Sequence, residues 1–332
     1  MDDVTAKLLI PPTATYEEWT AARAELSRTA VTASEIATVL GISPWGSPFN
    51  LFHLKRGTIT SDYDDDVLSL GRHLEPWIAD RWADDHPEFV VGETGLWQSE
   101  ERPWQMATPD RYLWDPNAED RTWREHDALL EIKTSGTYEG WGEDGTDQIP
   151  PYYRAQVLWQ LDTLGLEVGH VACLFLSSRQ RRDYVIEFDE TDVKLMRDAA
   201  QEFLALVEQG IAPDIDHTPA TAQALKQLYP LDAEAEDAEI PADLAKDWRF
   251  AKASLDDAQD NYDLLTSKLR AAMGSSKRAV VDGKKVATRS VYEKSGVQIK
   301  RLRAEFPDAY EACRTTSTVD KLTPARAKKD AS

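Results

Sequence analysis

The chain has 332 residues, of which 42% are hydrophobic and 29% charged, and its formal net charge is -21. This length allows one large domain with an appendage or two modest domains. No apolar run approaches the roughly 20 residues that a membrane-spanning helix requires, the first residues lack the pattern of a signal peptide, and two cysteines are too few for a disulfide framework. We therefore expect a soluble protein in a reducing, cytoplasmic setting.

Charge is distributed unevenly along the chain. A net charge of -21 argues against nucleic acid as a partner, because phosphate contacts are normally made by Lys and Arg. Residues 231–263, however, carry 11 acidic and 3 basic side chains, whereas residues 265–303 carry 11 basic and 2 acidic ones. The total therefore hides a basic segment. The histidines and cysteines show no zinc or iron–sulfur spacing, so any metal should be held by oxygen atoms.

The first motif is a short helix in "VTASEIATVLG", residues 31–41. Thr32 is a plausible N-cap with Glu35 three residues later, which is a capping box, and Gly41 suits the C-terminal end. Ser34 then lies in the first turn, where free backbone N–H groups favour an anion. The alternative is that Ser34 only supports the cap.

The stretch "LSLGRHLEPWIADRW" predicts an amphipathic helix that rests on a sheet. The residues that recur every four positions are Leu70, Leu74, Ile78 and Trp82. Glu75 follows one of these positions, and a carboxylate near a core boundary needs a cation or hydrogen bonds. The alternative is a glutamate at the solvent edge.

Two strands are predicted from "WQMATPD", which ends at Asp110, and "DALLEIKT", which contains Glu131 and Lys133. Because side chains alternate along a strand, Glu131 and Lys133 should share one face. The intervening stretch can turn the chain back, so that Asp110 approaches Glu131 from the neighbouring strand. That stretch also supplies Arg121 and Arg124, which either meet phosphate or balance local acids.

This combination of residues fits the hydrolysis of a phosphodiester. The reaction needs hard cations on the phosphoryl oxygens, carboxylates that hold those cations, and a group that orients or deprotonates water. Asp110 and Glu131 supply the carboxylates, and Lys133 supplies the third group or stabilises transition-state charge. The alternative is an ordinary surface pair of Glu and Lys.

A further helix is predicted in "PPYYRAQVLWQLDTL". Gln156 and Gln160 are four residues apart and share a helix face, where either could orient water or touch a DNA backbone. The alternative is two exposed polar residues. We expect Tyr152 and Tyr153 to pack against other side chains rather than to stack on bases.

The C-terminal part begins with an acidic linker and continues as a long helix. Apolar residues then alternate in steps of four and three, which is the heptad seam of a helix that packs along another helix: Leu244, Trp248, Ala251, Leu255, Ala258, Tyr262, Leu265, Leu269 and Ala272. Gly274 should end it, and "AVVDGKKVATRSVY" reads as a hairpin that turns at Asp282 and Gly283. This arm is either a helical appendage with a basic hairpin or a device that steers DNA.

The motif of Pro109-Asp110 followed by Glu131-Ile132-Lys133 resembles the PD-(D/E)xK nucleases. The flanking blocks "LSRTAVTASEIATVLGISPWGSPFNLFHLKRG", "LSLGRHLEPWIADRW" and "QIPPYYRAQVLWQLDTLGL" are similar, in this order, to the YqaJ-like viral recombinase family, which includes the phage lambda-type exonucleases. The resemblance covers about residues 27 to 205.

The resemblance implies roles for particular residues. Metal would be held by Glu75, Asp110, Glu131 and the backbone carbonyl of Ile132. The catalytic residues would be Glu75, Asp110, Glu131, Lys133 and Gln156. Arg28, Ser34 and Thr108 would contact the 5′-terminal phosphate or the DNA; Thr108 stands where relatives often have serine, and both carry a hydroxyl.

The resulting expectation is an α/β (α+β) fold: a PD-(D/E)xK restriction-endonuclease-like core with a mixed central sheet flanked by helices, plus a C-terminal helical arm and basic hairpin. We expect a nuclease domain over residues 1–229, an acidic linker over 230–243, and the arm and basic segment over 244–332.

The resemblance implies a Mg²⁺-dependent exonuclease, with Mn²⁺ as a substitute, that digests the 5′-ended strand of linear double-stranded DNA. The 3′ single-stranded tails would serve phage-type homologous recombination. The implied partners are double-stranded DNA ends and a single-strand annealing protein, the implied assembly is a trimeric ring, and the implied setting is the cytoplasm of a bacterial host with a phage or prophage. An endonuclease, or a catalytically silent DNA-end-binding or recombinase-loading module, remains the alternative.

Overall fold

The computed structural model describes residues 6–61, 65–116, 127–232, 234–316 and 319–325. Contacts divide the chain into two compact units, Met1–Pro230 and Leu231–Ser332. The predicted boundaries of the linker, 230–243, stay a prediction.

A five-stranded sheet forms the centre of the first unit. Its order is β3 (Val90–Glu93), β6 (Arg111–Trp114), β7 (Ala128–Ser135), β8 (Val168–Phe175) and β9 (Gln180–Glu187). Only β7 and β8 run parallel, because the chain between them crosses over through helix α5 (Pro151–Leu164). The other neighbours are antiparallel, so the sheet is mixed as predicted.

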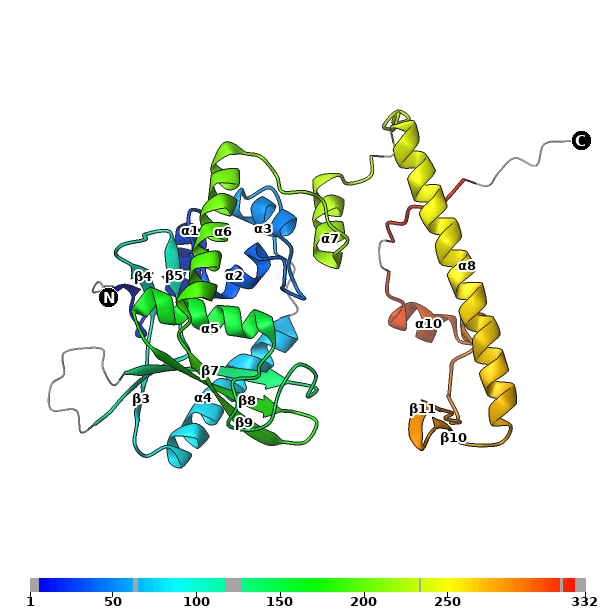
Figure 1. Cartoon of the computed structure of the whole chain (residues 1–332). Helices are drawn as coiled ribbons and strands as arrows, with labels where there is room; N and C mark the ends of the chain where they lie inside the picture. The colour runs from blue at the N-terminus through cyan, green and yellow to red at the C-terminus, as the bar shows by residue number, and fades with distance from the viewer. Residues whose placement is uncertain (1–5, 62–64, 117–126, 233, 317–318, 326–332) are drawn as a thin grey trace, which may run out of the picture. The chain divides into compact units, whose positions relative to one another are not determined.

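Helices cover both faces of this sheet. Figure 1 shows α5 over one face and α4 (Asp65–Asp85) across the other. The residues of β7 divide between the two faces by alternation: Leu129 belongs to the core cluster under α5, whereas Leu130 and Ile132 pack with α4. Every residue of α5 from Val157 to Leu164 is buried, since the helix lies between the sheet and further elements.

The remaining elements complete the first unit. A four-stranded sheet has the order β1 (Ala6–Ile10), β4 (Leu96–Ser99), β5 (Gln105–Ala107) and β2 (Val31–Thr32). The other helices are α1 (Tyr16–Leu26), α2 (Ala33–Val39), α3 (Pro48–Lys55), α6 (Glu190–Gln209) and α7 (Pro219–Leu228).

The predicted helix at α2 is confirmed in detail. The backbone N–H of Thr32 donates to Oε2 of Glu35 at 2.9 Å, and the helix passes through Leu40 into Gly41, whose φ is +68°. A positive φ is readily adopted by glycine, so Gly41 ends the helix at the predicted place.

The apolar stripe predicted on α4 is only partly right. Ile78 and Trp82 are fully buried against β7 and β8, and Leu74 packs at the edge of the same cluster. Leu70, however, is 48% exposed. The periodicity identified the helix correctly but not where its contact with the sheet begins.

The second unit contains the predicted helix and hairpin. Helix α8 spans Ala242–Met273 and is followed by β10 (Arg278–Val281), β11 (Lys284–Thr288), α9 (Ile299–Glu305) and α10 (Pro307–Cys313). Asp282 and Gly283 both have positive φ, as a two-residue hairpin turn requires. The predicted fold class, with its helical arm and basic hairpin, is confirmed. In the described part of the chain, no helix is long and apolar enough to span a membrane.

Candidate active site

Glu131 and Lys133 form the centre of the site on β7. Glu131 is 1% exposed, and the ammonium of Lys133 donates a hydrogen bond to its Oε1. Their side chains share a face because they are two residues apart on a strand, as predicted. An ordinary surface pair is excluded by this burial, so the two charges depend on each other and on neighbouring polar groups.

Asp110 joins them from the start of β6. The pairing of β6 with β7 runs from Leu113 opposite Ala128 to Arg111 opposite Leu130. One residue further, Oδ2 of Asp110 accepts the backbone N–H of Ile132 at 2.7 Å, so a side chain continues the hydrogen bonding of the strand. Burial and the negative charges of Glu131 and Glu75 raise the pKa of Asp110 well above its ordinary value, against the attraction of Lys133.

Two glutamines of α5 hold the carboxylate of Glu131. Nε2 of Gln156 donates to Oε1 at 2.6 Å, and Nε2 of Gln160 donates to Oε2 at 2.8 Å. The predicted sharing of a helix face is confirmed, but the structure brings both residues to the site. Gln160 is fully buried. The alternative of two exposed polar residues is therefore wrong for Gln160, and the prediction that singled out Gln156 missed it.

Glu75 reaches the same region from α4 but is engaged in an ion pair. Its Oε1 accepts a hydrogen bond from Nη1 of Arg111 at 2.7 Å, and its side chain is 33% exposed. The same Arg111 nitrogen donates to the backbone oxygen of Asp110 at 2.5 Å. Among the described residues, no group of three or more His, Cys, Asp or Glu side chains is placed to hold a metal ion. The three predicted carboxylate ligands are thus not gathered around one point.

The oxygen ligands that do lie close together still fit a magnesium ion. Mg²⁺ prefers oxygen and is commonly held by one or two carboxylates, with water and substrate phosphate completing its shell. Asp110 and Glu131 provide two carboxylates whose mutual repulsion a cation relieves. The N–H of Ile132 faces Asp110, and its carbonyl lies on the same side, because both backbone groups of a strand residue point to one neighbour. Oε1 of Glu75 is engaged by Arg111, so this oxygen can add a ligand only by leaving Arg111.

A cleft of about 480 Å³ opens beside these residues. Its lining includes Asp110, Gln156, Glu75, Thr108, Arg72, Arg23, Thr32 and Ser34. Nη2 of Arg23, from α1, donates to Oγ of Ser34 at 2.7 Å, and Oγ1 of Thr32 lies 3.2 Å from the same oxygen. A guanidinium and two hydroxyls at the first turn of α2 form a polar, positively charged corner of the cleft.

The arginine in this corner differs from the predicted one. Arg28 lies exposed in the turn after α1 and is not part of the cleft lining, whereas Arg23 is. Arg23 and Arg72 were missed in the sequence. No local pattern in the sequence separates Arg23, on α1, from Arg28 in the turn that follows it. Thr108 lines the cleft, and its backbone oxygen lies 3.5 Å from Nε2 of Gln160.

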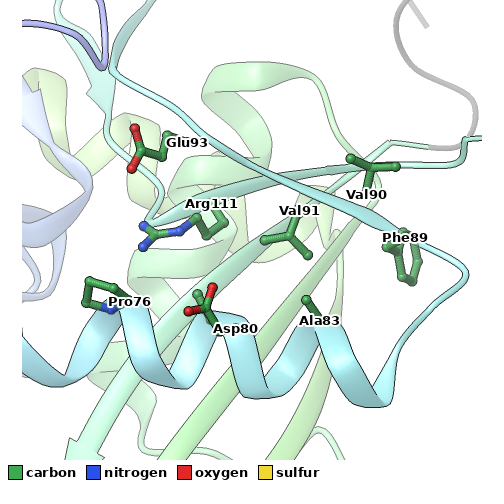
Figure 2. A pocket seen from close by; sticks show the side chains of 9 residues that line it. Pro76, Asp80, Ala83, Phe89, Val90, Val91, Glu93 and Arg111 are labelled. Carbon is green, nitrogen blue, oxygen red and sulfur yellow. The ribbon is translucent and has the colours of Figure 1, made fainter.

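A second pocket of about 460 Å³ lies between α4 and β3 and shares Pro76, Glu93 and Arg111 with the cleft. Figure 2 shows Arg111 directed between Glu93 above and the α4 residues Pro76 and Asp80 below. Arg111 therefore lines both pockets and is ion-paired with Glu75.

The tyrosines of α5 pack as predicted. The ring of Tyr152 meets that of Trp45 edge-on with centroids 5.1 Å apart. The ring centroids of Tyr153 and Trp141 are 5.6 Å apart. The ammonium of Lys133 lies 5.1 Å from the centroid of the Tyr153 ring, which adds a cation–π contact at the site. Arg121 and Arg124 lie outside the described residues.

The mixed sheet and the convergence of Asp110, Glu131 and Lys133 define the class as an α/β protein with a PD-(D/E)xK core. Residues 18–167 match the family model of the YqaJ-like viral recombinase domain. The predicted resemblance is confirmed. The chain is also 22% identical over 303 residues to the protein YqaJ of Bacillus subtilis (strain 168), with 89% of each chain covered.

Solved structures similar to this chain include proteins described as exonucleases. An alkaline exonuclease from Laribacter hongkongensis is 24% identical with a TM-score of 0.44, over 59% of this chain and 94% of that one. Its complex with dAMP is 23% identical with a TM-score of 0.45, over the same shares. A phage-related exonuclease from Haemophilus somnus 129PT is 9% identical with a TM-score of 0.39, over 55% of this chain and 96% of that one.

Proposed function

We propose that this protein is a Mg²⁺-dependent deoxyribonuclease that digests the 5′-ended strand of linear double-stranded DNA and leaves 3′ single-stranded tails. The observation that carries the proposal is the cluster of buried Glu131 with the partly buried Asp110 and Lys133, of which Asp110 lines an open cleft. The family comparison supports it, because residues 18–167 match the model of a viral recombinase domain.

Asp110, Glu131 and the carbonyl of Ile132 would hold the cation, and Mn²⁺ would accept the same oxygen ligands. When bound, Mg²⁺ neutralises charge on the phosphoryl oxygens and makes a bound water more acidic. Glu75 would contribute as a further ligand once its ion pair with Arg111 opens.

Lys133 acts in this proposal as a fixed positive charge. Burial alone would lower its pKa, but the adjacent carboxylates of Glu131 and Asp110 raise it above the ordinary value. The ammonium therefore stays protonated at neutral pH, where it orients the attacking water and stabilises negative charge that develops on the phosphate. Gln156 keeps the carboxylate of Glu131 in place through its hydrogen bond to Oε1.

The polar corner of the cleft supports action from a 5′ end. Arg23, Ser34 and Thr32 lie in the same cleft as Asp110, and the first turn of a helix with a guanidinium beside it favours a phosphate. A terminal phosphate bound there would place a nearby phosphodiester at Asp110 and Glu131. The 3′ tails would pass to an annealing protein in the cytoplasm of a host that carries a phage or prophage.

The proposal is tested by nucleotide release from linear duplex with and without a 5′ phosphate, beside closed circular duplex, in Mg²⁺ or EDTA. Lys133→Ala and Glu131→Ala serve as inactive variants, with circular dichroism as the check on folding. We expect loss of linear DNA alone, only with Mg²⁺, and faster with the 5′ phosphate. Cleavage of the circle would instead indicate an endonuclease. A folded protein that binds DNA ends but releases no nucleotide would establish the silent end-binding module.

A further inference from the structure

Helix α8 presents an uncovered apolar face along its whole length. It has 32 residues, none of which is buried. Leu244, Trp248, Leu255, Tyr262, Leu265 and Leu269 are between 37% and 66% exposed. At about 1.5 Å per residue the helix is roughly 48 Å long, and an apolar stripe of that length normally packs against another element.

The spacing of the stripe specifies the shape of its partner. The nine residues of the heptad seam identified above, from Leu244 to Ala272, follow steps of four and three without a break. A strict seven-residue repeat keeps a seam in contact with a second helix that coils around the first, whereas a helix on a globular surface follows a period of 3.6. The covering element is therefore a helix of similar length.

The described part of this chain offers no such helix besides α8 itself. The next longest helices, α4 and α6, already bury their apolar residues in the first unit: Ile78 and Trp82 of α4, and Val193, Met196 and Phe203 of α6. A second copy of the chain does supply one.

The charges of α8 permit two copies to meet. Five of its six acidic residues lie on the outer face, away from the seam and its flanks: Asp243, Asp256, Asp257, Asp260 and Asp263. The flanking positions carry only Asp247, Lys252 and Lys268 as charged residues. A chain with a net charge of -21 would repel its copies over most of its surface, but this seam is free of like-charge pairs when two copies of the helix align antiparallel.

The sizes of the seam residues select the orientation. Trp248, Leu255, Tyr262 and Leu269 occupy one set of heptad positions, and the other set is mostly alanine, with Ala251, Ala258 and Ala272. Parallel helices would place each set against itself, which leaves voids between alanines and crowds the aromatic rings. Antiparallel helices place Trp248, Tyr262 and Leu269 against alanines and Leu255 against Leu265, which avoids both the voids and the crowding of aromatic rings.

We propose that two copies of this chain pair through α8 in an antiparallel coiled coil centred near residue 260. In this register Tyr262 packs against Ala258 of the partner subunit, Trp248 against Ala272 of the partner subunit, and Leu269 against Ala251 of the partner subunit. The pairing joins two nuclease units in one particle and does not depend on what those units cleave.

The pairing is tested by sedimentation equilibrium of the full-length chain with two matched variants. Leu264 and Leu265 are adjacent and each 52% exposed, but only Leu265 lies on the seam. We expect Leu265→Glu to halve the particle mass at micromolar concentration, while Leu264→Glu keeps the mass of the unmodified chain. Circular dichroism checks that both variants fold. A mass unchanged in Leu265→Glu, or reduced equally in both variants, overturns the proposal.

The orientation is tested by disulfide cross-linking in a Cys313→Ser background, since Cys313 is the exposed cysteine and Cys173 is buried. Antiparallel pairing predicts that the double variant Ala251→Cys/Leu269→Cys forms a covalent dimer on mild oxidation, whereas Ala251→Cys alone does not. A covalent dimer from Ala251→Cys alone would establish parallel helices and overturn the antiparallel register.

Discussion

The side-chain amide of Gln160 donates to Oε2 of Glu131 at 2.8 Å from a fully buried position on α5. Gln156, one turn earlier, meets the other oxygen of the same carboxylate at 2.6 Å. Both oxygens of Glu131 are thus oriented by one helix. This helix, α5, connects β7 to β8 and is itself buried in the core from Val157 to Leu164. The position of the carboxylate depends on two amides, although the sequence singled out only one.

This arrangement predicts that Gln160→Met lowers the rate of DNA cleavage about 10- to 100-fold, as is usual when a group that orients a metal ligand is removed. Methionine has a similar length, so the core stays filled while the hydrogen bond is lost. The rate on linear duplex is measured across a Mg²⁺ titration, with thermal unfolding as the folding control. An unchanged rate in a folded variant would mean that Gln156 alone positions Glu131.

A second prediction separates the two arginines near α2. Arg23 hydrogen-bonds Ser34 in the cleft, whereas Arg28 is exposed outside it. Arg23→Ala should therefore remove most of the preference for 5′-phosphorylated over 5′-hydroxyl ends, and Arg28→Ala should retain it. Both rates are measured on the same linear duplex. Loss of the preference in Arg28→Ala, with Arg23→Ala unaffected, would restore the assignment made from the sequence.

The contrast between these residues shows what the sequence could predict. Glu131 and Lys133 share a face because a strand alternates, and this holds wherever the strand lies. The choice between Arg23 and Arg28 depends on where α1 ends and how the next turn returns, which no local pattern specifies. The burial of Gln160 likewise follows from tertiary packing on both sides of α5, since its hydrophobic neighbours are consistent with either a surface or a core helix.

Lys55 provides a third prediction, on stability. Its ammonium donates to the backbone oxygens of Ser27 and Ala30 and to Glu35, and its side chain is only 2% exposed. Removing one partner of a buried pair leaves the other charge without compensation, which typically costs 3–5 kcal/mol. Lys55→Met should therefore lower the free energy of unfolding by about 3 kcal/mol or more.

The matched control for Lys55 is Lys194, which pairs with Asp198 at 2.6 Å on the surface of α6. Both side chains of that pair are more than half exposed, so Lys194→Met should cost less than about 1 kcal/mol. Denaturant unfolding of the full chain compares the two variants. Equal losses would show that the contacts of Lys55 contribute no more than a surface ion pair.

The last prediction concerns His170, which lies on β8 on the α4 side of the sheet. Its ring packs against Trp82 at 5.3 Å and Phe89 at 5.3 Å. Burial, helped by the positive charge of His86 and opposed by Glu88, lowers the pKa of His170 from 6.5 to about 4. Between these two pH values the unfolded chain binds a proton at this position that the folded chain does not. The folded state must therefore lose stability as the pH falls from 6.5 toward 4, at up to about 1.4 kcal/mol per pH unit.

Urea unfolding at pH 7 and at pH 5 tests this dependence on the unmodified chain and on His170→Phe. The phenyl ring keeps the packing with Trp82 and Phe89 but binds no proton, so the variant should lose less stability between the two pH values. The difference between the two proteins should approach about 2 kcal/mol at pH 5, since the unfolded histidine is almost fully protonated there. Parallel pH profiles for both proteins would show that His170 is protonated in the folded state, and that the aromatic cluster around it tolerates the charge.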